Sequence, residues 1–195
     1  MTSIILDDVS FAYPRGRTLL KSVSGSVRGS AGRTVVVMGS SGSGKSTLLK
    51  MLAGLLAPTG GRVAWQPENA VRAYLPQEGV LFEHLSRHDN ARYFTRIAKL
   101  RGRFSERAYE RAVDKLRMRA ILDQERGVDL MSGGEKQRLA IVRALSIEPH
   151  GLLLDEPCNG LDNSVKYDFL TELRTLTDDL GLLVVYVTHH ADEAR

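Results

Sequence analysis

The sequence predicts an α/β fold, with a mostly parallel sheet covered by helices and a helical segment inserted into it. Three apolar runs, rich in β-branched residues or leucine, are typical of strands buried on both faces: 34–38, 151–154 and 182–187. Three segments read as helices between or before these strands: 46–56, 135–146 and 165–180. The length of 195 residues fits one domain, or one domain with a small insertion.

The elements follow in a clear order along the chain. From the N-terminus we predict a strand at 4–9, a strand at 23–27, the buried strand at 34–38, the helix at 46–56, and a short hairpin of 63–65 with 71–75. The stretch that follows reads as helical, and the last third returns to α/β. We therefore expect one domain over 1–195, with a core and small β region from 1–77 and 132–195, and a helical subdomain at 78–131.

Composition limits the class of protein. No apolar run approaches the roughly 20 residues that cross a bilayer, and the N-terminus lacks the pattern of a signal peptide. One cysteine, Cys158, excludes an internal disulfide. The net charge is +4, and residues 87–126 hold 12 basic side chains against 6 acidic ones. That basic segment is either a solvated helical face or a surface for a membrane, an acidic partner or nucleic acid.

The strongest signal is the loop that follows the strand at 34–38. The segment 39–46 reads GSSGSGKS and matches the G-x-x-x-x-G-K-[ST] P-loop in full. Its glycines let backbone N–H groups approach phosphate oxygens, Lys45 should reach the β- and γ-phosphates, and Ser46 should bind Mg²⁺. The predicted nucleotide-binding residues of this segment are Gly39, Ser40, Ser41, Gly42, Ser43, Gly44, Lys45, Ser46 and Thr47.

A second signal is the apolar strand at 151–154, which ends in Asp155 and Glu156. Side chains alternate in direction along a strand, so the two carboxylates need not share one task. Asp155 fits a Mg²⁺ role, and Glu156 fits the group that polarises the attacking water. Many strands end in acidic residues, so this feature alone is a weak signal. Here it follows a P-loop by about 110 residues, and the two motifs together indicate ATP hydrolysis.

Between these two motifs, residues 131–138 read MSGGEKQR and resemble the signature motif of ATP-binding cassette (ABC) ATPases. The resemblance covers essentially the whole chain in the family's order. It implies a P-loop NTPase fold with a RecA-like core, and it implies roles for further residues. These are Tyr13 on adenine, Gln77 in the Q-loop at Mg²⁺ and the attacking water, Ser132, Gly133 and Gly134 in the signature, Asp162 in the D-loop, and His189 as the switch histidine.

The resemblance also implies a mechanism and partners. Two cassettes would meet head to tail around two ATP molecules, with Ser132 and Gly134 of one chain at the γ-phosphate held by the other. A separate transmembrane permease would convert this cycle into transport, with its coupling helix docked near Gln77 and the 78–131 helices. A substrate-binding protein is a further possible partner, and direct nucleic-acid binding is not expected. The chain would then lie peripherally on the cytoplasmic face of the plasma membrane.

The chain departs from the family's pattern at four places. Met131 replaces the usual leucine, Glu135 stands where many members have glutamine, and His190 follows the switch histidine where aspartate is usual. The sequence stops soon after His189, so the fold is expected to be short at its C-terminus, and less stable or completed by a partner. Two other functions stay open: a soluble ABC ATPase acting on ribosomes or nucleic acid, and a degenerate regulatory cassette.

Overall fold

The computed structural model describes residues 2–29, 33–77, 81–97, 100, 102–124 and 126–194. Its strands form one four-stranded and one three-stranded sheet. The helix α1 (Lys45–Leu52) lies between them, because its leucines share one apolar cluster with Ile4 and Trp65 of the small sheet and with Leu153 of the large one. The larger cluster lies on the other face of the large sheet, against α4, α6 and α7.

The large sheet has the order β3-β7-β6-β5, and every neighbouring pair is parallel. Its strands are β3 (Thr34–Met38), β7 (Leu183–Thr188), β6 (Gly151–Asp155) and β5 (Arg72–Leu75). Every residue of β6 and β7 is buried, as the continuous apolar runs predicted. Because all four strands are parallel, the loops after their carboxyl ends meet at one edge of the sheet, where ligands bind in open α/β folds.

The small sheet is antiparallel and has the order β2-β1-β4. It consists of β2 (Thr18–Gly29), β1 (Thr2–Ala12) and β4 (Gly60–Gln66). The predicted strands at 4–9 and 23–27 are therefore present, but each is longer than its apolar pattern indicated. The half-exposed pattern of β2 explains why its outer residues did not read as a strand.

The predicted hairpin of 63–65 with 71–75 is wrong. These segments belong to different sheets: Trp65 in β4 pairs with Ile4, and Ala73 in β5 pairs with Leu152. A two-stranded hairpin is marginal in water, whereas both segments gain buried partners by pairing with distant strands. Trp65 packs in the core, where its indole N–H donates to the Leu52 carbonyl at 2.9 Å, so it acts as a structural residue.

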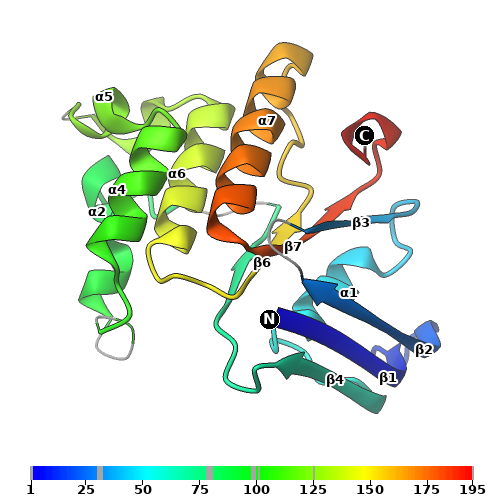
Figure 1. Cartoon of the computed structure of the whole chain (residues 1–195). Helices are drawn as coiled ribbons and strands as arrows, with labels where there is room; N and C mark the ends of the chain where they lie inside the picture. Colours follow the sequence, from blue (N-terminus) through cyan, green and yellow to red (C-terminus); the bar gives the residue numbers. More distant parts are fainter. Residues whose placement is uncertain are drawn as a thin grey trace.

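Helices cover the large sheet and form a separate side of the molecule. The two long helices that flank β6 are α6 (Gly133–Leu145) and α7 (Asn163–Leu180). The segment predicted to be helical holds short helices: α2 (Arg87–Ala91), η1 (Tyr93–Arg96), α4 (Glu106–Lys115), α5 (Arg119–Leu122) and η2 (Val128–Leu130). Figure 1 shows α2, α4 and α5 on the side of the molecule opposite the small sheet. A last turn, η3 (Ala191–Ala194), follows β7.

Many cations of the basic segment are paired within the chain. Arg92 holds Glu106 with both terminal nitrogens, at 2.6 and 2.5 Å, and Arg119 contacts Glu110 and Asp114 at 2.5 and 2.6 Å. These pairs favour a solvated helical face over a nucleic-acid surface. Within the part of the chain that the structure describes, no helix is long and apolar enough to cross a membrane.

Candidate functional site

The loop between β3 and α1 has the backbone shape that a phosphate-binding loop needs. Gly42 and Gly44 have φ values of +75° and +99°, which residues with a Cβ rarely adopt. A Cβ at Gly39 would lie 2.8 Å from the Ser43 hydroxyl, which would then have to rotate away. The loop then runs into the N-terminus of α1, where backbone N–H groups and the helix dipole favour an anion.

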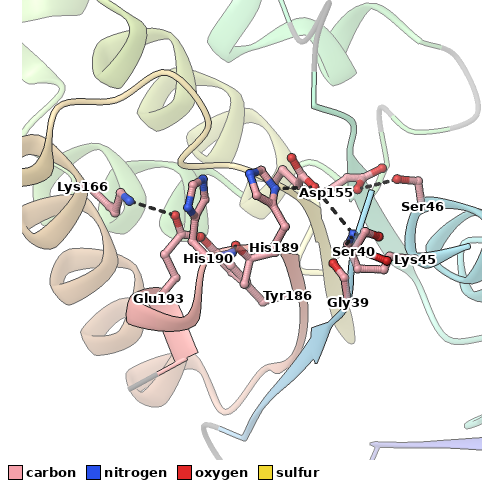
Figure 2. Close-up of polar contacts among 12 residues, drawn as sticks. Gly39, Ser40, Lys45, Ser46, Asp155, Lys166, Tyr186, His189, His190 and Glu193 are labelled. Atoms are coloured by element: carbon pink, nitrogen blue, oxygen red, sulfur yellow. Dashed lines mark hydrogen bonds and ion pairs between the residues drawn. The ribbon is translucent and has the colours of Figure 1, made fainter. Parts of the chain in front are cut away.

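Lys45 begins α1 and turns back over the loop. It is buried, and its ammonium donates to the carbonyls of Gly39 and Ser40 at 2.8 and 2.9 Å. The same nitrogen lies 3.9 Å from Glu156 Oε1, so the loop cation and the carboxylate after β6 share one small region. Figure 2 shows Lys45 between the loop and the carboxyl end of β6.

Asp155 is the last residue of β6 and is 4% exposed. Its Oδ1 accepts a hydrogen bond from the Ser46 hydroxyl at 2.9 Å, and its Oδ2 accepts one from the Tyr74 phenol at 3.1 Å. Burial, together with the Asp155 charge, raises the pKa of Tyr74, so the phenol keeps its proton and donates at neutral pH. Both carboxylate oxygens are thus held by hydroxyl donors.

Glu156 faces a different set of partners, as the alternation of side chains along a strand predicted. Its Oε1 lies 3.0 Å from His189 Nδ1. Glu156 has a φ of +47°, uncommon for a residue with a side chain, and its N–H donates to the Val187 carbonyl at 2.9 Å. Backbone strain of this kind is often found at functional sites, where neighbouring contacts impose it.

Lys45, Ser46, Glu156 and His189 line one cavity of about 550 Å³ at the carboxyl edge of the large sheet. The predicted residues that line it are Tyr13, Ser41, Gly42, Gly44, Lys45, Ser46, Thr47, Gln77, Glu156 and His189. Leu19 and Asn159 also line it, although the sequence reasoning did not include them in the site. Tyr13 is 43% exposed there, so part of its ring is accessible for stacking. Its hydroxyl lies 3.3 Å from that of Thr47.

Comparison with known proteins decides the family. A model of the family described as "ABC transporter" matches residues 20–159. The chain belongs to the ABC transporter family. Its fold is also that of ABC ATPases: it superposes with a TM-score of 0.79 and 28% identity on a bacterial Atm1-family ABC exporter with ATP bound, over 98% of this chain and 35% of that one.

Several curated ABC proteins are similar along most of this chain. The molybdate/tungstate import ATP-binding protein WtpC of Pyrococcus abyssi is 36% identical over 82% of this chain and 48% of its own length. The sulfate/thiosulfate import ATP-binding protein CysA of Xanthomonas campestris is 37% identical over 84% and 50%. UgpC of Ruegeria pomeroyi, an sn-glycerol-3-phosphate import ATP-binding protein, is 39% identical over 100% and 56%. The chain thus spans about half the length of these relatives.

The segment 131–138, which resembles the ABC signature motif and is called the signature segment below, leads into α6. Ser132 is the N-cap: its hydroxyl accepts from the Glu135 N–H at 3.3 Å, and its own N–H donates to the Glu135 carboxylate at 2.7 Å. This capping box gives Glu135, which stands where many members have glutamine, a physical role. A Cβ at Gly134 would lie 2.8 Å from Val165, so glycine allows α6 to approach α7. Met131 is buried in the main core, as a volume-conserving replacement of leucine would be.

The structure does not bring every predicted residue to the cavity. Eight predicted site residues are described but are not among the residues that line it: Gly39, Ser40, Ser43, Asp155, Ser132, Gly133, Gly134 and Asp162. Gly39 and Ser40 still contact Lys45, and Asp155 contacts Ser46, and both of these partners line the cavity. Asp162 is exposed and lies at the N-terminus of α7. Tyr74 was missed by the sequence reasoning: a tyrosine three residues before Gln77 carries no motif, and its contact with Asp155 spans 81 residues.

Proposed function

We propose that this chain is the ATP-binding and ATP-hydrolysing part of an ABC transporter whose permease is a separate chain. The observation that carries the proposal is the position of Glu156. Its carboxylate lies 3.0 Å from His189 and 3.9 Å from Lys45, in a cavity walled by the P-loop. A carboxylate that can activate water and a cation that binds the phosphates are recurring parts of sites that transfer a phosphoryl group, and His189 gives the carboxylate a partner.

The residues divide the work of hydrolysis among them. Lys45 and the loop N–H groups bind the β- and γ-phosphates, and Tyr13 stacks on adenine. Glu156 accepts a proton from water as the oxygen attacks the γ-phosphorus and the bond to the ADP oxygen breaks. His189 orients Glu156 and contacts the transferred phosphoryl group. These side chains would hold the attacking water close to the γ-phosphate, and such positioning contributes much of the rate acceleration in sites of this kind.

The residues also fit Mg²⁺. Ser46 and Asp155 place two oxygen donors 2.9 Å apart beside the P-loop, and Gln77 lines the same cavity. Mg²⁺ prefers one or two protein oxygens together with phosphates and water, and it does not need a dedicated cage of side chains. When bound, it would neutralise charge on the phosphates. We therefore assign Ser46, Gln77 and Asp155 as its protein contacts.

The test is Glu156→Gln. Losing the general base should slow ATP hydrolysis by about 10²–10⁴-fold while nucleotide still binds. Glu68→Gln, in the exposed turn after β4, is the matched control and should keep the wild-type rate. Both rates are measured as phosphate release, and binding as the fluorescence of a labelled ATP. Near-normal hydrolysis by Glu156→Gln would show that Glu156 is not the general base. If the wild-type chain with its permease hydrolysed no ATP, the alternative of a regulatory cassette would be supported instead.

We further propose that two cassettes complete each site, with Ser132 and Gly134 acting across the interface. Support comes from their place at the N-terminus of α6, where free N–H groups attract an anion, outside the cavity of their own chain. Mixing Glu156→Gln with Ser132→Arg is the test. In a head-to-tail hybrid, one site keeps both a normal Glu156 and a normal Ser132, so the mixture should recover up to about a quarter of wild-type activity. Hybrid dimers without recovered activity would exclude the arrangement.

The transport partners complete the proposal. A groove of about 260 Å³ between β5 and α6 is lined in part by Phe94, Leu100 and Ile147, and it suits an apolar segment of the permease. Phe94→Asp should then weaken co-purification with the permease and leave nucleotide binding intact. The three curated relatives named above are import proteins with different substrates, whereas the superposed structure is that of an exporter, so the assignment of import rests on the curated relatives. A cytoplasmic, peripheral position at the membrane and delivery by a substrate-binding protein follow from that assignment.

A further inference from the structure

The two oxygens of Asp155 have different neighbours, and the mechanism above uses only one of them. Oδ1 faces the Ser46 hydroxyl, the proposed Mg²⁺ contact, at 2.9 Å. Oδ2 points away from that contact and accepts from the Tyr74 hydroxyl at 3.1 Å. Because Asp155 is 4% exposed, water offers little replacement for either donor. The orientation of the carboxylate therefore depends on Tyr74 as much as on Ser46.

Sheet geometry explains why Tyr74 reaches Asp155. In the parallel pairing of β5 with β6, Tyr74 lies opposite Leu153, and Asp155 stands two residues further along the strand. Residues two apart share a face of a sheet, so all three side chains lie on the face covered by α1. The Tyr74 ring packs against the apolar cluster that contains Leu153, Leu49 and Leu52. A side chain of this length, fixed at its ring, brings its hydroxyl to the carboxylate at the strand end.

We propose that Tyr74 is a positioning residue for Mg²⁺ binding, which fixes the Asp155 carboxylate so that Oδ1 is presented beside Ser46. The inference rests on the proposed nucleotide site. Groups that orient a metal ligand by hydrogen bonds typically contribute 10–100-fold to metal affinity. Tyr74 lies in β5, which ends at Leu75, and Gln77 follows two residues after that end, so the same short segment brings both the positioning hydroxyl and a second predicted Mg²⁺ contact to this edge of the sheet.

The experiment compares Tyr74→Phe with the wild-type chain and with Tyr109→Phe. Phenylalanine keeps the ring and its packing and removes one oxygen. Tyr109 is more deeply buried than the half-buried Tyr74 and lies in α4 away from the cavity, so its variant controls for loss of a tyrosine hydroxyl from the protein interior. Two quantities are measured: the affinity for fluorescent ATP in excess EDTA, and the binding of Mn²⁺ to the protein with ATP, followed by electron paramagnetic resonance. Thermal melting checks that each variant folds.

Tyr74→Phe should bind metal-free nucleotide like the wild type and should need about ten times more Mn²⁺ for half saturation. Tyr109→Phe should match the wild type in both measurements. Unchanged Mn²⁺ binding by Tyr74→Phe would overturn the inference. Equal losses with and without metal would overturn it too, because they would show a general structural role. A wild-type chain that binds neither ATP nor Mn²⁺ would instead refute the proposed nucleotide site itself.

Discussion

Lys166 offers a sharp test of what holds the segment after His189 in place. Its ammonium lies 3.2 Å from Glu193 Oε1 and 3.3 Å from Asp192 Oδ2, which joins α7 to η3. The Glu193 side chain is 1% exposed, and its other oxygen accepts from the Tyr186 hydroxyl at 2.7 Å (Figure 2). Oε1 has no hydrogen bond of good geometry among the described residues, so Lys166 is its compensating charge.

The size of the effect of Lys166→Met follows from that burial. Removing one partner of a buried ion pair costs about 3–5 kcal/mol, because the other charge stays buried alone. The lower end applies here, since Tyr186 still donates to Glu193 and the 46%-exposed Asp192 side chain returns to water. We expect the free energy of unfolding to fall by about 3 kcal/mol. For a chain of this size about 2–4 °C corresponds to 1 kcal/mol, so Tm should fall by about 6–12 °C.

Urea and thermal denaturation of four chains measure this effect: the wild type, Lys166→Met, Glu193→Gln and the double variant. Neutralising both partners removes the unpaired charge, so the double variant should be more stable than the sum of the single losses predicts. Arg174→Met is the control, because its pair with Asp178 is exposed and 4.0 Å long and should contribute under about 0.5 kcal/mol. A similarly small loss for Lys166→Met, with additive single effects, would refute the reasoning.

Three further predictions concern the thiol, one glycine and the core. Burial raises the pKa of the Cys158 thiol to about 11. Iodoacetamide at pH 8 should therefore alkylate the native protein at least about 100-fold more slowly than the urea-unfolded chain. Comparable alkylation rates would contradict the burial of this thiol. At Gly61, φ is +70° and a Cβ would lie 2.3 Å from the Asp7 carbonyl oxygen. Gly61→Ala should therefore lower the free energy of unfolding by more than about 2 kcal/mol in urea denaturation. Gly25→Ala is the control and should change it little, because nothing lies within 4 Å of a Cβ built there. Leu153→Ala in the fully buried β6 should cost about 2–5 kcal/mol, whereas Leu55→Ala, 62% exposed, should cost far less; equal losses would show that burial does not set the cost.

Local patterns predicted much of the fold and most of the cavity. The continuous apolar runs gave β3, β6 and β7 to within a residue or two, because strands buried on both faces need no alternation. The P-loop fixed the start of α1 for an equally local reason: glycines at positive φ and a helix N-terminus lie within a few residues of each other. Such features can be predicted from the sequence because residues that are close together along the chain form them.

Contacts between distant residues explain what sequence reasoning missed. The segments that became β4 and β5 are close in sequence, yet each pairs with a strand far along the chain, and no local pattern records that choice. Tyr74 reads as one more apolar residue of a strand until its hydroxyl is seen on Asp155. The buried pair of Lys166 with Glu193 depends on the approach of η3 to α7, which is likewise set by tertiary packing.

The signature segment combines two roles: it caps the start of α6, and it leaves backbone N–H groups that can bind an anion. The Ser132–Glu135 capping box uses the serine hydroxyl inside its own chain, where it satisfies an N–H at the start of α6. The helix N-terminus still carries further N–H groups and a favourable dipole, because a cap satisfies only part of the first turn. These groups do not line the cavity that holds Lys45 and Glu156, so in the proposed head-to-tail arrangement a phosphate that they contact would belong to another chain's cavity. A monomer would then hold all the parts of a site but never assemble them, and turnover per chain should rise with protein concentration until the dimer saturates.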